Sequence, residues 1–347
     1  MAEFSDILGV VDRAHLPKPG THDVARFKEW YHFNVLDPAH GVDLIINVSL
    51  NGNVVEAGGG MAEVILLCHR QATGWYGGID SYDGAAVALA RHEIGVNVAD
   101  AGTVHYAEGA YGIDLRLRDG TLEFTASLAP CTEPMLVWSD TTLGSGRLNW
   151  LIVPHLTATG VLRMDGESVD LCEVCAYHDH NWGYWKWGED FAWEWGFGAD
   201  MGTRNGDGRV IVVFDRTSDR ARETNLEHTL AIWRDDTLVK VFTRQMLRAR
   251  RSGRFAGDVS RIPGSARLIA QGRVLTVPAE ISVSARNEGD WLDVVYRVDA
   301  ALQVCVPSEL GFGHVELNET LGTLDVRGVI GGNKVEFSAR ASFEFLA

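Results

Sequence analysis

Hydrophobic and polar residues alternate in many short runs along the chain, a pattern that predicts β-strands. Residues 111–117 and 121–126 alternate on either side of Asp119-Gly120, which predicts a hairpin with a primed turn. Helical periodicity is scarce, and residues 242–251 are the best candidate for a single helix. Other short runs are β-branched or alternating and are bounded by turn residues: 42–48, 63–68, 210–214, 279–285, 292–298 and 334–345. Further turns are marked by Asp165-Gly166, Asp207-Gly208 and Gly331-Gly332-Asn333.

Many short strands at close spacing predict an all-β fold, with antiparallel barrels or sandwiches and little helix. The 347 residues exceed a typical single core, so we expect two domains packed together. A weak internal repeat places Glu29-Trp30 before one strand and Glu194-Trp195 before another. We therefore predict an N-terminal β domain over residues 1–186 and a C-terminal β domain over 187–347.

The composition of the chain limits the kinds of molecule that it is expected to bind. A formal charge of −16 argues against nucleic acid and anionic membranes, because both require clustered Lys and Arg. The five cysteines form no dense even framework, and no run of 18 apolar residues is present. The first residues lack the basic start and apolar core of a signal peptide. We expect a cytoplasmic protein.

One segment combines a carboxyl group, two imidazoles and several large aromatic rings: Tyr177-His178-Asp179-His180-Asn181-Trp182-Gly183-Tyr184-Trp185-Lys186-Trp187. A carboxyl group among large apolar rings loses water, so its pKa is expected to rise until it can act as a general acid. The same rings present faces that attract a cation. This segment therefore predicts a proton donor, Asp179, with a lining for the positive charge that protonation creates.

The alternation of a strand predicts where these side chains point. If residues 169–177 continue as a strand, Tyr177 and Asp179 share one face, while His178 and His180 share the other. Asn181-Trp182-Gly183 predicts that the strand ends there, and a bulge could bring one histidine round to Asp179. In the alternative interpretation, Asp179 and Asn181 cap a turn and the aromatic residues fill a core.

A metal site is the rival hypothesis for this segment. Cys172, Cys175, His178 and His180 combine a Cys-x-x-Cys with two imidazoles. Strand alternation puts the two cysteines on opposite faces, so we expect no metal. No nucleophile elbow, phosphate loop or dinucleotide fingerprint appears, and no cofactor is expected.

Three motifs together resemble the carotenoid 1,2-hydratase and AttH-like family, which includes Diels–Alderase-type cyclases: Glu29-Trp30-Tyr31-His32-Phe33, the segment from Tyr177 to Gly183, and Gly311-Phe312-Gly313-His314-Val315-Glu316-Leu317. The resemblance implies two calycin-like, lipocalin-related β domains with a hydrophobic pocket at or near their junction and no organic cofactor. It also implies that Asp179, with Tyr177 beside it, donates a proton to an isoprenoid double bond. The hydratase branch has a His-x-Trp element one strand earlier, where this chain has Leu148-Asn149-Trp150, so His155 or His180 is the candidate imidazole.

The expected function is that of an enzyme without a cofactor that binds a small lipophilic terpenoid or polyene. Acid catalysis by Asp179, with Tyr177 and either His178 or His180 in support, would lead to hydration or cyclisation. One alternative is a pericyclase whose pocket shape sets the reaction; another is a lipocalin-like carrier without activity. Peripheral contact with membranes could serve to collect the substrate. The residues predicted to line the substrate site are Trp30, Trp150, Trp182, Tyr184, Trp195 and His314.

Overall fold

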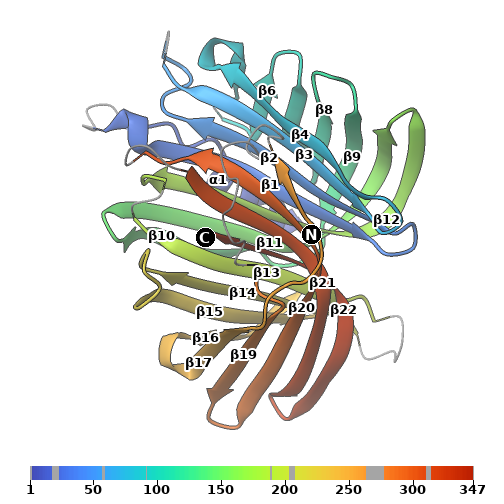
Figure 1. The fold of residues 1–347 in the computed structure, drawn as a ribbon, viewed down its shortest axis with the longest axis vertical. Coiled ribbons are helices and arrows are strands. Elements are labelled where there is room, and N and C mark those ends of the chain that lie inside the picture. The colour runs from blue at the N-terminus through green and yellow to red at the C-terminus, as the bar shows by residue number, and fades with distance from the viewer. Residues whose placement is uncertain are drawn as a thin grey trace. The chain divides into compact units, whose positions relative to one another are not determined.

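Two compact units make up the chain, Met1–Trp185 and Lys186–Ala347. We call them unit 1 and unit 2; Figure 1 draws unit 1 in blue to green and unit 2 from green-yellow to red. The structure is a computed structural model that describes residues 2–17, 23–56, 59–90, 92–187, 190–202, 208–262, 277–309 and 314–346.

Unit 1 begins with the helix α1 (Ala2–Val11) and is otherwise built from strands and two 3-10 turns, η1 (Val24–Arg26) and η2 (Gly84–Ala86). Within the described residues its sheet has the order β4-β3-β2-β1-β12-β11-β9-β8-β7-β6-β5, with β10 paired to β11, and forms a nearly closed antiparallel barrel. The strands are β1 (Phe27–Asp37), β2 (Val42–Asn51), β3 (Met61–Arg70), β4 (Gly74–Asp83), β5 (Val87–Leu89), β6 (Gly95–Val98), β7 (Gly102–Ala107), β8 (Ala110–Arg116), β9 (Leu122–Pro130), β10 (Met135–Leu143), β11 (Gly146–Met164) and β12 (Glu167–Tyr184).

Alternation along these strands explains the core of unit 1. Tyr31 and Phe33 of β1 lie opposite Val48 and Ile46 of β2, and all four belong to one buried hydrophobic cluster. We call the face that carries this cluster the core face and the other side the outer face. Leu8 of α1 joins the same cluster, so the N-terminal helix packs on the core face. Burial of such side chains stabilises the unit by about 1.5–3 kcal/mol each.

Unit 2 is a second sheet, with the order β16-β15-β14-β13-β22-β21-β20-β19-β17 among the residues described. Its pairs are antiparallel except for β18, which runs parallel to β20. The elements are β13 (Ala192–Asp200), β14 (Val210–Ser218), β15 (Asn225–Arg234), β16 (Thr237–Thr243), η3 (Arg244–Met246), β17 (Leu247–Ser252), β18 (Val259–Ile262), β19 (Glu280–Asn287), β20 (Asp290–Pro307), β21 (His314–Ile330) and β22 (Asn333–Leu346).

The Glu-Trp repeat occupies equivalent places in the two units. Glu29 is the third residue of β1, which lies between β2 and β12; Glu194 is the third residue of β13, which lies between β14 and β22. Each first strand thus pairs with the second and the last long strand of its own unit. Both glutamates are buried, and Glu194 lies opposite Phe345 of the unit 2 core.

The predicted all-β fold with little helix is confirmed, and each predicted strand run lies on an observed strand. Several of the observed strands are longer than predicted, and β20 continues nine residues beyond the predicted end at Val298, to Pro307. The turns at Asp165-Gly166 and Gly331-Gly332 are confirmed as well, with positive φ at both central residues, as a type I′ turn requires. Asp207 of the remaining predicted turn lies outside the described residues.

Three details of the prediction are wrong. The helix predicted at residues 242–251 is a pair of strands, β16 and β17, joined by η3, in which Arg244 has a φ of 46°. In the hairpin of β8 and β9 the hydrogen-bonded turn runs from Leu117 to Gly120, and neither Arg118 nor Asp119 has a positive φ, so the turn is not primed. The strand predicted to end at Asn181-Trp182-Gly183 does not end there, because β12 continues through Gly183 to Tyr184.

In the part of the chain that the structure describes, no helix has the length and apolar character needed to cross a bilayer.

Candidate functional site

The two faces of β12 carry different chemistry. From Leu36 opposite Cys175 to Phe27 opposite Tyr184, β12 pairs with β1 without a register shift. Side chains of residues that pair directly lie on the same face. His178 pairs with Phe33 and His180 with Tyr31, so both histidines lie on the core face. Asp179 therefore lies on the outer face, and no bulge brings either histidine to it.

Asp179 is 2% exposed and receives two hydrogen bonds from its own strand. The Tyr177 hydroxyl donates to Oδ2 over 3.1 Å, and Asn181 Nδ2 donates to Oδ1 over 2.8 Å. These donors sit two residues before and after Asp179, where strand geometry places side chains on one face. Both carboxyl oxygens are thus held in a fixed orientation.

A chain of neutral polar groups lies beside Asp179 on β1 and β2. His32, the direct partner of Asp179, donates through Nε2 to Oδ1 of Asn34 over 2.9 Å, and its Nδ1 faces Asn47 Nδ2 at 3.4 Å. Burial lowers the pKa of His32 to about 4, so the ring is neutral near pH 7. The imidazole that lies directly opposite Asp179 in the strand register is thus that of His32, to which the sequence analysis gave no role.

Two indoles share the outer face with Asp179. Trp30 and Trp150 both lie opposite Asn181, on β1 and β11. Trp30 meets Trp185 edge to face at 5.0 Å between ring centroids, and Trp150 meets Trp138 at 5.0 Å. The acid and two of the predicted aromatic residues thus come together on one face.

A bulge in β11 settles where His155 lies. Three steps from Val153 to Leu156 on β11 oppose only two steps on β12, so Pro154 and His155 both lie opposite Tyr177. His155 is completely buried. Of the two candidates for the imidazole of the hydratase branch, His155 lies opposite Tyr177 in the strand register, whereas His180 lies on the core face.

On the core face, His180 joins two buried carboxylates. Its Nδ1 lies 2.7 Å from Asp12 and its Nε2 lies 2.8 Å from Glu29. All three side chains are completely buried. Burial alone would lower the pKa of His180, but the hydrogen bonds to Asp12 and Glu29 raise it to about 9. His180 is thus an imidazolium at neutral pH, with a proton on each nitrogen.

Asp12 inserts into the core of unit 1 directly after α1. The Tyr111 hydroxyl donates to its Oδ2 over 2.5 Å, and His178 Nε2 lies 3.2 Å from the same oxygen. His178 donates through Nδ1 to the carbonyl oxygen of His32 over 2.9 Å. Although burial opposes ionisation, His178 and His180 hold the pKa of Asp12 well below its usual range. The N-terminal segment is therefore fastened to the barrel by a buried charge.

His15 extends this cluster toward the surface. Its ring stacks on Trp182 with centroids 3.9 Å apart, and its backbone N–H donates to Glu29 Oε1 over 2.7 Å. Nitrogen and oxygen atoms of His15, Glu29 and His180 lie within 4.8 Å of one another, close enough to hold a metal ion. No cysteine belongs to this group.

The remaining predicted lining residues are dispersed. Trp182 and Tyr184 follow His180 on the core face, where Tyr184 meets Phe27 edge to face. Trp195 and His314 belong to unit 2; His314 Nε2 lies 3.1 Å from Glu316.

Trp195 contributes to a second setting of a carboxyl group among indoles. The Nε1 groups of Trp193 and Trp195 donate to Oε1 of Glu344 over 2.5 and 3.1 Å. Glu344 pairs with Glu319 of β21 and shares a hydrogen bond with its carboxyl group. Burial raises the pKa of Glu344, and two carboxyl groups that hydrogen-bond to each other require a proton between them.

Sequence reasoning missed Asp12 and His15, and it quoted Glu29 and His32 without giving them a role. Alternation applied to Glu29-Trp30-Tyr31-His32-Phe33 would have placed Glu29 and His32 on opposite faces. No strand pattern surrounds Asp12, so no comparable signal existed there.

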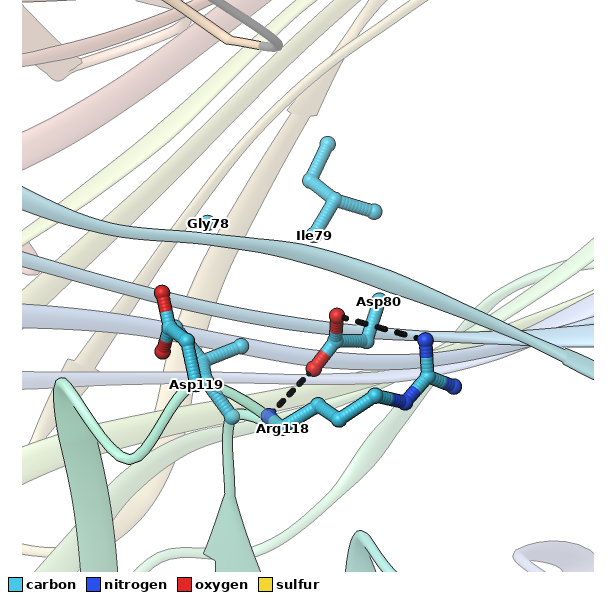
Figure 2. A pocket seen from close by; sticks show the side chains of 6 residues that line it. Gly78, Ile79, Asp80, Arg118 and Asp119 are labelled. Atoms are coloured by element: carbon cyan, nitrogen blue, oxygen red, sulfur yellow. Dashed lines mark hydrogen bonds and ion pairs between the residues drawn. The ribbon is translucent and has the colours of Figure 1, made fainter.

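Two pockets formed by described residues lie away from the site residues named above. One of them, of about 290 Å³, lies beside β4 in unit 1. There Asp80 accepts a hydrogen bond from the backbone N–H of Arg118 over 2.6 Å and forms an ion pair with the Arg118 side chain (Figure 2). The β8–β9 turn thus fastens onto the edge strand β4. The other pocket, of about 410 Å³, lies in unit 2. Its lining residues are Asn225, Leu226, Glu227, His228, Arg244, Gln245 and Leu247. Neither contains a predicted site residue.

No family model matches the chain, and no curated protein matches it. Several solved structures match the chain. An AttH-like protein from Nitrosomonas europaea is 15% identical, with a TM-score of 0.65, over 97% of this chain and 98% of its own. Kievitone hydratase from Nectria haematococca is 10% identical, with a TM-score of 0.60, over 97% and 94%. CghA, solved with Sch210972, is 12% identical, with a TM-score of 0.59, over 96% and 94%. The likeness confirms the predicted AttH-like resemblance at the level of the fold: this chain has the fold of the AttH-like protein, kievitone hydratase and CghA.

Proposed function

We propose that the chain is an enzyme that binds a small lipophilic terpenoid or polyene and protonates an alkene through Asp179, with hydration or cyclisation as the outcome. The observation that carries the proposal is the setting of Asp179. Its carboxyl group is buried, oriented by Tyr177 and Asn181, and shares a face with the indoles of Trp30 and Trp150. One of the proteins that share the fold is named as a hydratase, which agrees with this chemistry.

Each group has a role in the proposed step. Asp179 transfers its proton to one alkene carbon, and the electron pair of the double bond forms the new C–H bond. The carbocation left on the other carbon faces aromatic rings, each of which stabilises a desolvated cation by about 2 kcal/mol. Water then adds and loses a proton, or a second double bond closes a ring and the new carbocation loses a proton to the Asp179 carboxylate. Tyr177 keeps the carboxyl group aimed at the substrate. General acid catalysis of this kind contributes roughly 10²- to 10⁴-fold.

The test compares Asp179→Asn with wild type on a panel of linear isoprenoids and polyenes, with products analysed by mass spectrometry. Hydration adds the mass of water, whereas cyclisation changes retention time at constant mass. We expect Asp179→Asn to lose at least about 100-fold in turnover while it still binds substrate. Asp43→Asn, a buried aspartate of β2, is the matched control and should keep its activity.

Two other outcomes would contradict the proposal and favour a different function. Turnover that survives Asp179→Asn but is lost in Trp150→Leu would favour a pericyclase, in which pocket shape holds the reacting carbons together. Binding of polyenes without any product would favour a carrier.

A further inference from the structure

The core-face cluster of unit 1, formed by Asp12, His15, Glu29 and His180, contains two buried polar atoms that make no hydrogen bond. Oε2 of Glu29 and Nδ1 of His15 are buried, and neither has a hydrogen bond among the described residues. A buried polar atom left unsatisfied costs about 1–3 kcal/mol. His15 Nδ1 lies 3.5 Å from Oε1 of the same Glu29 carboxyl group, so the two atoms that lack a hydrogen bond are close together.

His180 supplies the third ligand. Its Nε2 lies 2.8 Å from Oε1 of Glu29, beside the unpartnered oxygen. Two imidazoles and one carboxylate are a ligand set that Zn²⁺ and related divalent ions bind in proteins. One ligand atom from each of the three residues lies within 4.8 Å of the other two, so small side-chain movements suffice to reach bonds of about 2.0–2.2 Å to a central ion.

Asp12 supplies the outer partner that such a site needs. It accepts the Nδ1–H of His180 over 2.7 Å, which directs Nε2 toward Glu29. A carboxylate on the far nitrogen of a ligating histidine is a common arrangement around zinc, because it fixes the ring and makes Nε2 a better ligand. Stacking of His180 on Tyr31, with centroids 4.1 Å apart, fixes the plane of the ring as well.

The charges of the cluster favour a cation. Asp12 and Glu29 place two carboxyl groups at hydrogen-bond distance from the His180 ring, over 2.7 and 2.8 Å. The side chain of His15 is 29% exposed, so an ion can enter from its side of the cluster.

We propose that His15 Nδ1, Glu29 Oε2 and His180 Nε2 bind a divalent transition-metal ion of the zinc type inside unit 1, with Asp12 holding His180 in place. The site lies on the core face, whereas Asp179 lies on the outer face. It is therefore independent of the proposed enzymatic function.

The experiment uses tag-free full-length protein, stripped with a chelator and titrated with Zn²⁺ by calorimetry. Wild type is expected to bind one Zn²⁺ per chain, and its melting temperature should rise with the metal. His15→Gln and Glu29→Gln should abolish this binding, and Asp12→Asn should weaken it by about 10- to 100-fold. His69→Gln removes a buried histidine of β3 outside the cluster and should bind as wild type does.

Absence of Zn²⁺ binding by wild type, or equal binding by His15→Gln, would overturn the proposal. If Glu29→Gln fails to fold, as judged by circular dichroism, His15→Gln decides the matter, because its partly exposed ring lies on the segment after α1. Asp179→Asn should bind Zn²⁺ as wild type does, so failure of this proposal is separable from failure of the proposed function.

Discussion

Asp179 and His180 are consecutive residues of β12, yet their side chains lie on opposite faces of its sheet and belong to different networks. Asp179 is held by Tyr177 and Asn181, whereas His180 bridges Asp12 and Glu29. One segment of sequence thus contributes to two separate pieces of chemistry. Variants of the two residues should have different consequences.

Tyr177→Phe should lower turnover by about 10-fold, since it removes one hydrogen bond to a charged or acidic group, worth about 1.5 kcal/mol. Substrate binding should change little, because Tyr177 acts through Asp179. Steady-state kinetics would show a fall in kcat with a similar KM.

Tyr296→Phe is the matched control for Tyr177→Phe. Its hydroxyl is also buried and donates to Thr320 over 3.0 Å, but it lies in the core of unit 2. Both variants should lose a similar amount of stability, and only Tyr177→Phe should lose turnover. A similar loss of turnover in both would remove the positioning role of Tyr177.

Asp12→Asn should destabilise the protein by about 3 kcal/mol, because it leaves the His180 imidazolium with one carboxylate instead of two in a buried site. Urea unfolding followed by circular dichroism measures the loss. A variant as stable as wild type would show that the N-terminal segment is not fastened by this charge.

Stability should fall as the pH drops from 6.5 toward 4, because His32 is neutral in the folded protein and takes up a proton on unfolding. Its folded pKa of about 4 lies below the ordinary value of 6.5, so the unfolded state binds more protons in this window. The full effect of one such histidine is about 3 kcal/mol. Urea unfolding at several pH values measures it.

His32→Asn should remove only part of this pH dependence. Burial also lowers the pKa of His228 in unit 2 to about 4, so His228 keeps its own share. An unchanged slope in His32→Asn would mean that His32 is not neutral in the fold.

Glu344→Gln should remove an opposite dependence. Because burial raises the pKa of Glu344, the folded state holds a proton that the unfolded state releases above about pH 4.5, and stability is lost as the pH rises through the folded pKa. Glutamine keeps an acceptor for Trp193 and Trp195 and a donor for Glu319. At pH 8 the variant should therefore be at least as stable as wild type, whereas Glu336→Gln, exposed on the same strand, should follow the wild-type curve.

Much of the fold follows from local signals that act over a few residues. Alternating strands and the glycines of primed turns predict the pairing of β11 with β12 and of β21 with β22. The β12 extension was missed because Gly183 suggests a strand end. In the fold, a Cβ at Gly183 would lie 2.0 Å from the carbonyl oxygen of Arg147, so glycine is needed there for close approach of two strands.

The site was predictable only in part, because its two halves depend on different information. The Tyr177–Asp179 pair follows from alternation within one strand. The His180 cluster joins Asp12, Glu29 and His180, which are up to 168 residues apart, and their meeting depends on how the barrel closes and where the N-terminal segment inserts. The helix predicted at 242–251 failed for a similar reason, since Phe242 and Leu247 reach the core from two separate strands.

Turnover in D₂O tests the central claim most directly. If Asp179 protonates the substrate, its exchangeable proton becomes deuterium, and the product formed by wild type should carry one deuterium on the former alkene carbon, while Asp179→Asn forms no labelled product. Product without deuterium on carbon, formed equally by wild type and by Asp179→Asn, would contradict a proton-donor role for Asp179.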